Sequence, residues 1–159
     1  MDGTGEVAVT VFEGIDAVRA AVGTHLGHSA WVTVTQAQVD TFAEATGDHQ
    51  WIHVDVERAT AESPFGGPIA HGYLTLALTN LFLPQVVEVR GVSLGVNRGT
   101  GRIRFPAPVP VGTRLRAGVD LVAVDDVTGG IDTTMRITVE REGGDKPVCV
   151  VESLSRYLA

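Results

Sequence analysis

The spacing of apolar residues in the first third of the chain predicts helices separated by short links. Residues 15–22 have the pattern of a short helix, and the apolar run at 31–34 predicts a strand. Thr35 and Gln38 have the three-residue spacing of a capping box, so a second helix is expected to begin there. Gly47 lies where that helix should end, because glycine readily adopts the left-handed conformation of a helix C-terminus.

The segments between these elements lack a regular period. Residues 1–11 predict a loosely tethered N-terminal extension, 23–29 a turn-rich link and 48–53 a loop after the second helix. Asp55 can cap a further short helix over 56–62.

The middle of the chain is free of charged side chains. No Asp, Glu, Lys or Arg occurs between residues 63 and 87, and 69–83 has an almost wholly apolar helical pattern that Pro84 should end. A helix of that length is about 22 Å long, whereas the hydrocarbon core of a bilayer is about 30 Å thick. We therefore expect a helix buried inside a soluble protein, and no membrane partner.

After Pro84 the apolar pattern changes from a helical period to alternation. Alternating segments separated by glycine-rich turns predict strands over 91–96, 102–105, 113–123, 131–140 and 147–157. One early strand, one long buried helix and consecutive strands predict an α+β protein whose antiparallel sheet wraps around a long central helix. That arrangement is the hot-dog fold, and residues 1–159 are expected to form a single domain of this kind.

Composition limits the compartment and the partners. Apolar residues make up 44% of the chain, and charged residues make up 19%, which indicates that some surface is buried against a second copy. A net charge of −7 argues against a nucleic-acid partner. Cys149 is the single cysteine and the first residues lack the pattern of a signal peptide, so we expect a cytoplasmic protein.

The densest polar segment, 45–55, contains Asp48 and His53 five residues apart. Addition of water to a carbon–carbon double bond needs a base for the water and an acid for the other carbon. A carboxylate and an imidazole that converge on one water can divide these roles. The spacing equally allows a structural role, in which Asp48 caps a turn and His53 packs inside.

The same region also offers ligand types for a metal ion. The possible ligands are Asp48, His49, His53, Asp55 and His71. Because the segment after the second helix is expected to be a loop, the four-residue spacing of its two histidines need not place them on one face. We expect no metal.

Gly72 lies near the start of the predicted central helix. N–H groups in a first helical turn are unpaired and carry the positive end of the helix dipole. The Gly72 N–H could therefore stabilise the negative charge on a thioester oxygen. The alternative is that glycine here only permits close packing of helix and sheet.

Glycines between residues 91 and 101 invite comparison with a nucleotide-binding loop, but a strand follows them instead of the required helix. The arginines nearby are more informative. Arg102 and Arg104 share one face of that strand and, with Arg98, form a basic cluster suited to phosphates. A solvated outer face of the sheet is the alternative.

Together these motifs resemble the MaoC-like, (R)-specific enoyl-CoA hydratase family, also called hydratase 2. The likeness rests on ATGDHQWIHVD at 45–55, FGGPIAHG at 65–72 and RFPAPV at 104–109, and it extends from about Trp31 to the C-terminus. It is greatest to the single hot-dog type of mycobacteria and other actinobacteria.

The resemblance implies a hydro-lyase that forms a homodimer, has its active site near the interface and needs no cofactor. Asp48 and His53 would activate the water that adds reversibly to trans-2-enoyl-CoA, giving (R)-3-hydroxyacyl-CoA. Gly72 would supply the oxyanion N–H. Some members have a serine nine residues beyond the motif's second histidine, where this chain has Asn80. The candidates for substrate contacts are His71, Asn80, Arg98, Arg102 and Arg104.

Other functions stay open beside this one. A hot-dog acyl-CoA thioesterase usually needs a carboxylate on or near the central helix, and 63–87 has none. A 3-hydroxyacyl-carrier-protein dehydratase would perform identical chemistry on an acyl group attached to a carrier protein instead of coenzyme A. A non-catalytic acyl-CoA-binding module or a subunit dependent on a partner would be expected to lack Asp48 or His53, and both are present.

Overall fold

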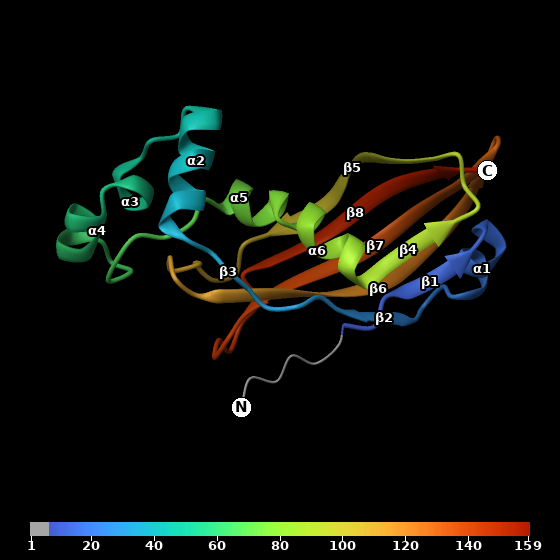
Figure 1. The fold of residues 1–159 in the computed structure, drawn as a ribbon, viewed down its shortest axis with the longest axis horizontal. Helices are drawn as coiled ribbons and strands as arrows, with labels where there is room; N and C mark the ends of the chain where they lie inside the picture. Colours follow the sequence, from blue (N-terminus) through green and yellow to red (C-terminus); the bar gives the residue numbers. More distant parts are fainter. Residues whose placement is uncertain (1–6) are drawn as a thin grey trace.

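An antiparallel sheet with a helical segment along one face is the central feature of residues 7–159, the residues that the computed structural model describes (Figure 1). The spatial order of the strands is β2-β6-β7-β8-β5, and the short β3 also pairs with β6. The strands are β2 (His25–His28), β3 (Val32–Thr33), β5 (Leu94–Arg104), β6 (Arg114–Val127), β7 (Gly130–Arg141) and β8 (Cys149–Leu158). This is the hot-dog architecture that the sequence predicts.

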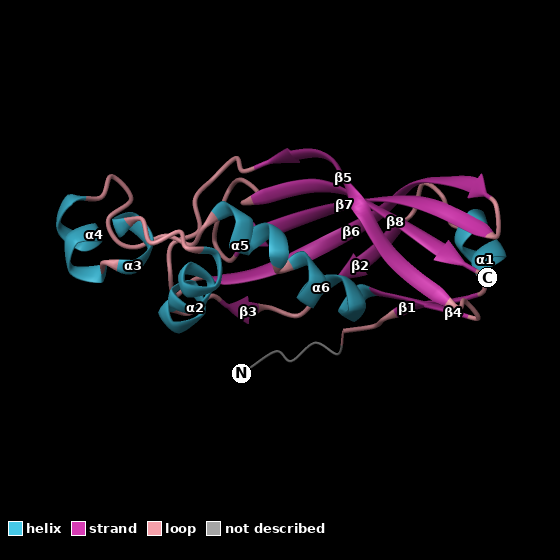
Figure 2. Cartoon of the chain, turned by 90° about the horizontal axis from the view of Figure 1, so that it is seen from above, coloured by secondary structure: helices cyan, strands magenta, loops and turns pink. Residues whose placement is uncertain are grey.

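The central helical segment consists of α5 (Gly72–Ala77) and α6 (Thr79–Val86), and it lies along the sheet (Figure 2). It begins later and ends later than predicted. Residues 69–71 are extended, because the Ile69 N–H donates to the Ile52 carbonyl and the next N–H donates to a loop carbonyl across the fold. Pro84 lies inside α6 instead of ending it. No helix within residues 7–159 combines the length and the apolar character that a membrane crossing requires.

The inner face of the sheet forms the core with this segment. The alternation predicted for β7 is confirmed, since every second residue of the strand is buried. These residues are Ile131, Thr133, Met135, Ile137 and Val139. Phe82 of α6 is fully buried and belongs to the same apolar cluster.

Two features at the N-terminal end differ from the prediction. Thr10 and Val11, expected in a loose extension, begin β1 (Thr10–Glu13), which pairs in parallel with β4 (Val87–Arg90). The rest of the predicted extension that falls on residues 1–6 lies outside the described residues. Helix α1 (Ile15–Ala20) begins where predicted and ends two residues before the predicted end at residue 22.

The link predicted at 23–29 contains β2, which pairs with β6 through an irregular register between His25 and Gly27. Strand β5 is continuous where two strands were predicted. Its pairing with β8 shifts register twice, near Gly99 and between Thr100 and Ile103, which explains the break in its sequence pattern.

The remaining helices gather at one end of the sheet, as both overall views show (Figures 1 and 2). They are α2 (Gln36–Thr46), α3 (Trp51–Val54) and α4 (Val56–Glu62). The capping box is confirmed: the Thr35 hydroxyl accepts from the Gln38 N–H at 3.2 Å, and the Gln38 side chain accepts from the Thr35 N–H at 3.4 Å. Asp55 caps α4 by accepting from the Arg58 N–H at 3.0 Å. Helix α3 is a single turn within the predicted loop.

Candidate active site

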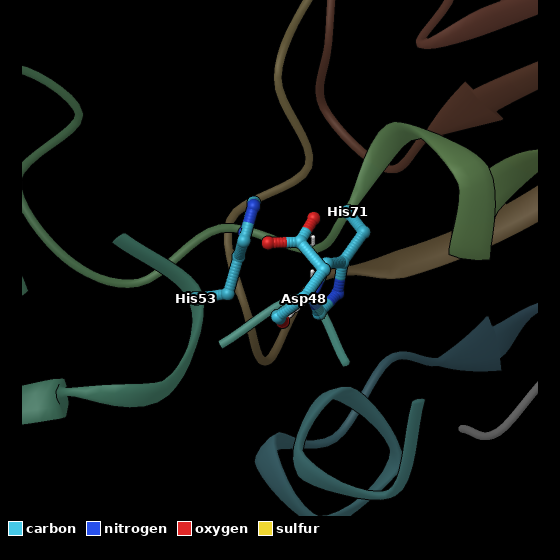
Figure 3. Close-up of side chains that lie close together, drawn as sticks. All are labelled: Asp48, His53 and His71. Atoms are coloured by element: carbon cyan, nitrogen blue, oxygen red, sulfur yellow. Dashed lines mark hydrogen bonds and ion pairs between the residues drawn. The ribbon is translucent and has the colours of Figure 1, made fainter. Parts of the chain in front are cut away.

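Three side chains from separate segments meet at the end of the sheet near α2 (Figure 3). Gly47 ends α2 in a left-handed conformation, with φ of 80°. Asp48 is the next residue, so it lies directly after the end of this helix. His53 is on α3, and His71 directly precedes α5. One ligand-type atom of each side chain lies within 4.8 Å of the others.

His53 is held in one orientation by its ring hydrogen bond. Its Nδ1 contacts the carbonyl oxygen of Ile69 at 2.6 Å, and because a carbonyl only accepts, Nδ1 carries the proton. The lone pair of the neutral ring is therefore on Nε2. His53 is only 7% exposed, and this burial lowers its pKa below the usual range.

Asp48 faces these rings but stays open to solvent. Its side chain is 54% exposed, and Oδ2 lies 4.0 Å from Nε2 of His71. Oδ1 accepts a hydrogen bond from the Gln50 N–H at 3.3 Å. The carboxylate is thus partly fixed by its own loop and remains accessible to a small molecule.

His71 contacts both of these residues. It is 3% exposed, and its Nε2 donates to the backbone carbonyl of Asp48 at 2.9 Å. Its ring stacks on that of His53, with centroids 3.9 Å apart and planes at 27°. The Phe42 ring from α2 covers it at 4.9 Å.

Gly72 opens α5 beside an apolar pocket of about 320 Å³. A Cβ added at Gly72 would lie 3.3 Å from the Phe105 ring, so glycine permits this close approach. Thr75 and Val109 also line the pocket. Ile69 also lines the pocket, and its carbonyl accepts the hydrogen bond from His53, so this residue links the imidazole to the pocket wall.

The other possible metal ligands are used elsewhere. His49 contacts Glu44 at 2.7 Å, and Asp55 caps α4. The ligand types of Asp48, His53 and His71 could hold a metal ion, but the Nε2 of His71 already donates to a backbone carbonyl.

The remaining candidates lie apart from this cluster. Asn80 lines hollows between α6 and the strands β5 and β8, together with Asn97 and Ser153. Its position nine residues along the central segment from His71 corresponds to roughly 13 Å of helix rise.

The predicted arginine cluster is divided. Arg98 forms an ion pair with Asp132, which also binds Arg156 at 2.6 Å. Arg102 and Arg104 instead line a hollow of about 300 Å³, and Glu152 and Arg136 complete its polar wall.

Several contributors were missed at the sequence level. The Ile69 carbonyl is a backbone group, so no side-chain pattern marks it. Phe105 entered the sequence analysis only as part of the motif at 104–109. The sequence did contain a signal that places Arg136 on the outer face of the sheet. It lies between Met135 and Ile137, which are buried, on a strand whose alternation was recognised.

Comparison with known proteins adds a family to this geometry. Residues 17–143 match the family model described as MaoC like domain. The chain is 54% identical over 149 residues to 3-hydroxyacyl-thioester dehydratase Z of Mycobacterium tuberculosis, covering 93% of this chain and 98% of the relative. It is 45% identical over 132 residues to nodulation protein N of Rhizobium meliloti, with 82% of each chain covered.

A solved structure has the same architecture. The (R)-hydratase from A. caviae involved in PHA biosynthesis aligns with a TM-score of 0.66 and 26% identity, covering 84% of this chain and 94% of that one.

Proposed function

Because this chain belongs to the MaoC-like dehydratase family of hydro-lyases, we propose that it reversibly adds water to trans-2-enoyl-CoA to give (R)-3-hydroxyacyl-CoA. The similar mycobacterial protein is named for 3-hydroxyacyl-thioester dehydration and the aligned structure for (R)-hydratase activity. The observation that carries the proposal is that an oxygen of the exposed Asp48 carboxylate lies within 4.8 Å of a ring nitrogen of His53, whose Nδ1 is bonded to the Ile69 carbonyl.

One water fits the proposed roles of this pair. A water that donates to two acceptors at hydrogen-bond distance separates them by about 4.4 Å, and ligand-type atoms of Asp48 and His53 lie within 4.8 Å. Asp48 orients the water, and Nε2 of His53 takes one of its protons as the oxygen bonds to the β-carbon. The pair then returns one proton to the α-carbon, so the π bond is replaced by one C–O and one C–H bond.

Charge that develops on the thioester oxygen needs a donor, and we assign it to the N–H of Gly72. This residue is the first of α5, where N–H groups have no partner within the helix. The absence of a Cβ lets the oxygen approach beside Phe105. The adjoining apolar pocket suits the alkyl part of an acyl group.

For the group that carries the acyl chain, we propose that Arg102 and Arg104 bind the phosphates of coenzyme A. Their hollow contains Arg136 as a third cation. Arg98 is expected to contribute less because it pairs with Asp132. Dehydration of a 3-hydroxyacyl group on a carrier protein is the second candidate, since the same dyad would serve both carriers of the acyl group.

The experiment that tests the chemistry replaces each member of the dyad with a near-isosteric residue. Asp48→Asn and His53→Gln should each lower kcat for crotonyl-CoA by about 10²–10⁴-fold, with chiral analysis showing the (R)-alcohol from the parent. The double variant should be little worse than either single one, because the two groups act as a unit. His49→Gln is the matched control, since His49 is next to Asp48 in sequence but contacts Glu44. Folded single variants that keep most of the parent's activity would rule out this mechanism.

A further inference from the structure

His71 touches both members of the proposed dyad, yet it is more enclosed than either of them (Figure 3). We propose that His71 is a positioning residue, which holds the backbone of Asp48 and the ring of His53 in the geometry that water addition requires. The inference rests on the proposed function, and it assigns His71 a role other than the substrate contact expected from sequence.

The first contact fixes where the carboxylate lies. Nε2 of His71 donates to the carbonyl of Asp48 at 2.9 Å, whereas its distance to the Oδ2 of that residue is 4.0 Å. The hydrogen bond from His71 therefore goes to the main chain and leaves the Oδ2 of Asp48 for water. Asp48 begins the loop after α2, and His71 directly precedes α5. The bond between them therefore holds this loop against the start of α5.

The second contact fixes the plane of His53. The two imidazole rings are stacked at 3.9 Å, and the Ile69 carbonyl holds the edge of His53 at 2.6 Å. A ring held from its face and its edge has little freedom to turn. Nε2 of His53 consequently keeps its direction, which matters because misplacement by about 1 Å can cost about 10²-fold in rate.

The position of His71 argues against direct contact with substrate. Only 3% of the residue is exposed, Nε2 is used, and Nδ1 is buried without a hydrogen-bond partner. The Phe42 ring packs against it as well. Neither nitrogen is therefore presented to a ligand.

Two substitutions separate the hydrogen bond from the ring. His71→Phe keeps an aromatic ring against His53 but removes the donor to Asp48, and His71→Gln keeps a donor of similar reach. We expect His71→Phe to lower kcat about 10²-fold with KM changed less than threefold. His71→Gln should recover at least tenfold of that loss. A raised KM with unchanged kcat would show a substrate contact and overturn the proposal, as would full activity of His71→Phe.

A spectroscopic measurement decides the geometry without activity and without a variant of His71. Nitrogen-15 NMR of the folded parent should show His71 with its proton on Nε2 and His53 with its proton on Nδ1, and His49→Gln provides an assignment control. A His71 proton on Nδ1 would overturn the proposal even if His71→Phe fails to fold. A parent that shows these tautomers but hydrates no enoyl thioester would instead refute the proposed function.

Discussion

Two histidines of this chain lie in one buried cluster and are suited to different tasks because their hydrogen bonds differ. His53 donates from Nδ1 to Ile69, so its Nε2 lone pair can accept a proton near Asp48. His71 donates from Nε2 to a carbonyl, and its other nitrogen is enclosed. In the proposed mechanism, the nitrogen that carries the ring proton makes His53 the base and His71 the positioning residue.

The role proposed for Gly72 can be tested by a substitution that removes its backbone N–H. Proline is well tolerated at the first position of a helix, and the preceding His71 already has the extended φ of −60° and ψ of 141° that proline requires. Gly72→Pro deletes the N–H, whereas Gly72→Ala keeps it and adds the same Cβ near Phe105. We expect kcat of the proline variant to fall about 10²–10³-fold below that of the alanine variant. Equal rates in steady-state assays would remove Gly72 from the oxyanion site.

Burial of His53 also predicts how stability depends on pH. Its folded pKa is lowered from the ordinary value of about 6.5, chiefly by burial, so the unfolded chain binds more protons between the two values. The stabilising contribution is complete above the unfolded pKa and is lost as pH falls toward the folded one. Thermal unfolding from pH 8 to 5 should therefore show a smaller drop in Tm for His53→Gln than for the parent.

His28 serves as the comparison, because partial desolvation and the charge of Arg116 lower its pKa, although it is an exposed residue on β2, away from the dyad. His28→Gln should flatten the Tm profile less than His53→Gln does, and it should leave the pH dependence of kcat unchanged. A His53→Gln profile parallel to that of the parent would contradict the assigned shift.

At the scale of elements, the sequence predicted those structures whose signals are local. The start and end of α2 follow from the Thr35 capping box and from Gly47, which need only neighbouring residues. Strand β7 is long enough for its alternation to be unmistakable. Helix α3 and strand β2 have four residues each, too few to show a period.

Local sequence patterns did not predict the end of α6 or the full set of groups in the candidate site. Pro84 stays inside α6 near its end, where its missing N–H removes only one hydrogen bond. The proximity of Asp48 and His53 was anticipated from a five-residue spacing, whereas their link to His71 depends on the extended segment 69–71. The Ile69 carbonyl enters the site only through that tertiary pairing.

The arginines of the proposed coenzyme A phosphate site are on β5 and β7. A substrate that lacks the phosphates of coenzyme A tests this site. Arg102→Ala/Arg104→Ala should raise KM for crotonyl-CoA at least tenfold with little change in kcat. The same variant should behave like the parent toward a crotonyl thioester of N-acetylcysteamine, which has no phosphates. Arg114→Ala is a matched control, because that arginine pairs with Glu142 on a different part of the sheet. An equal KM increase for both substrates would exclude phosphate recognition.

At the scale of the whole molecule, the β5 edge of the sheet offers an open strand to a partner. Strand β5 ends the sheet order, and Leu94 and Val96 on it are 50% and 43% exposed. An open strand with apolar side chains favours pairing with another chain. Tyr73 on α5 is 72% exposed and Leu81 on α6 is 45% exposed, which adds apolar surface on the central segment.

We propose that two copies pair through this edge, so light scattering at micromolar concentration should give about twice the 16.8 kDa of one chain. Charges on an edge strand oppose pairing, and the double variant Leu94→Lys/Val96→Lys should therefore shift the mass toward one chain. Val22→Lys changes an apolar side chain of similar exposure, 44%, that lies beyond α1, and it should leave the mass at two chains. A parent protein with the mass of one chain would refute the dimer. A dimeric parent whose mass is unchanged by the lysines would instead locate the interface away from β5.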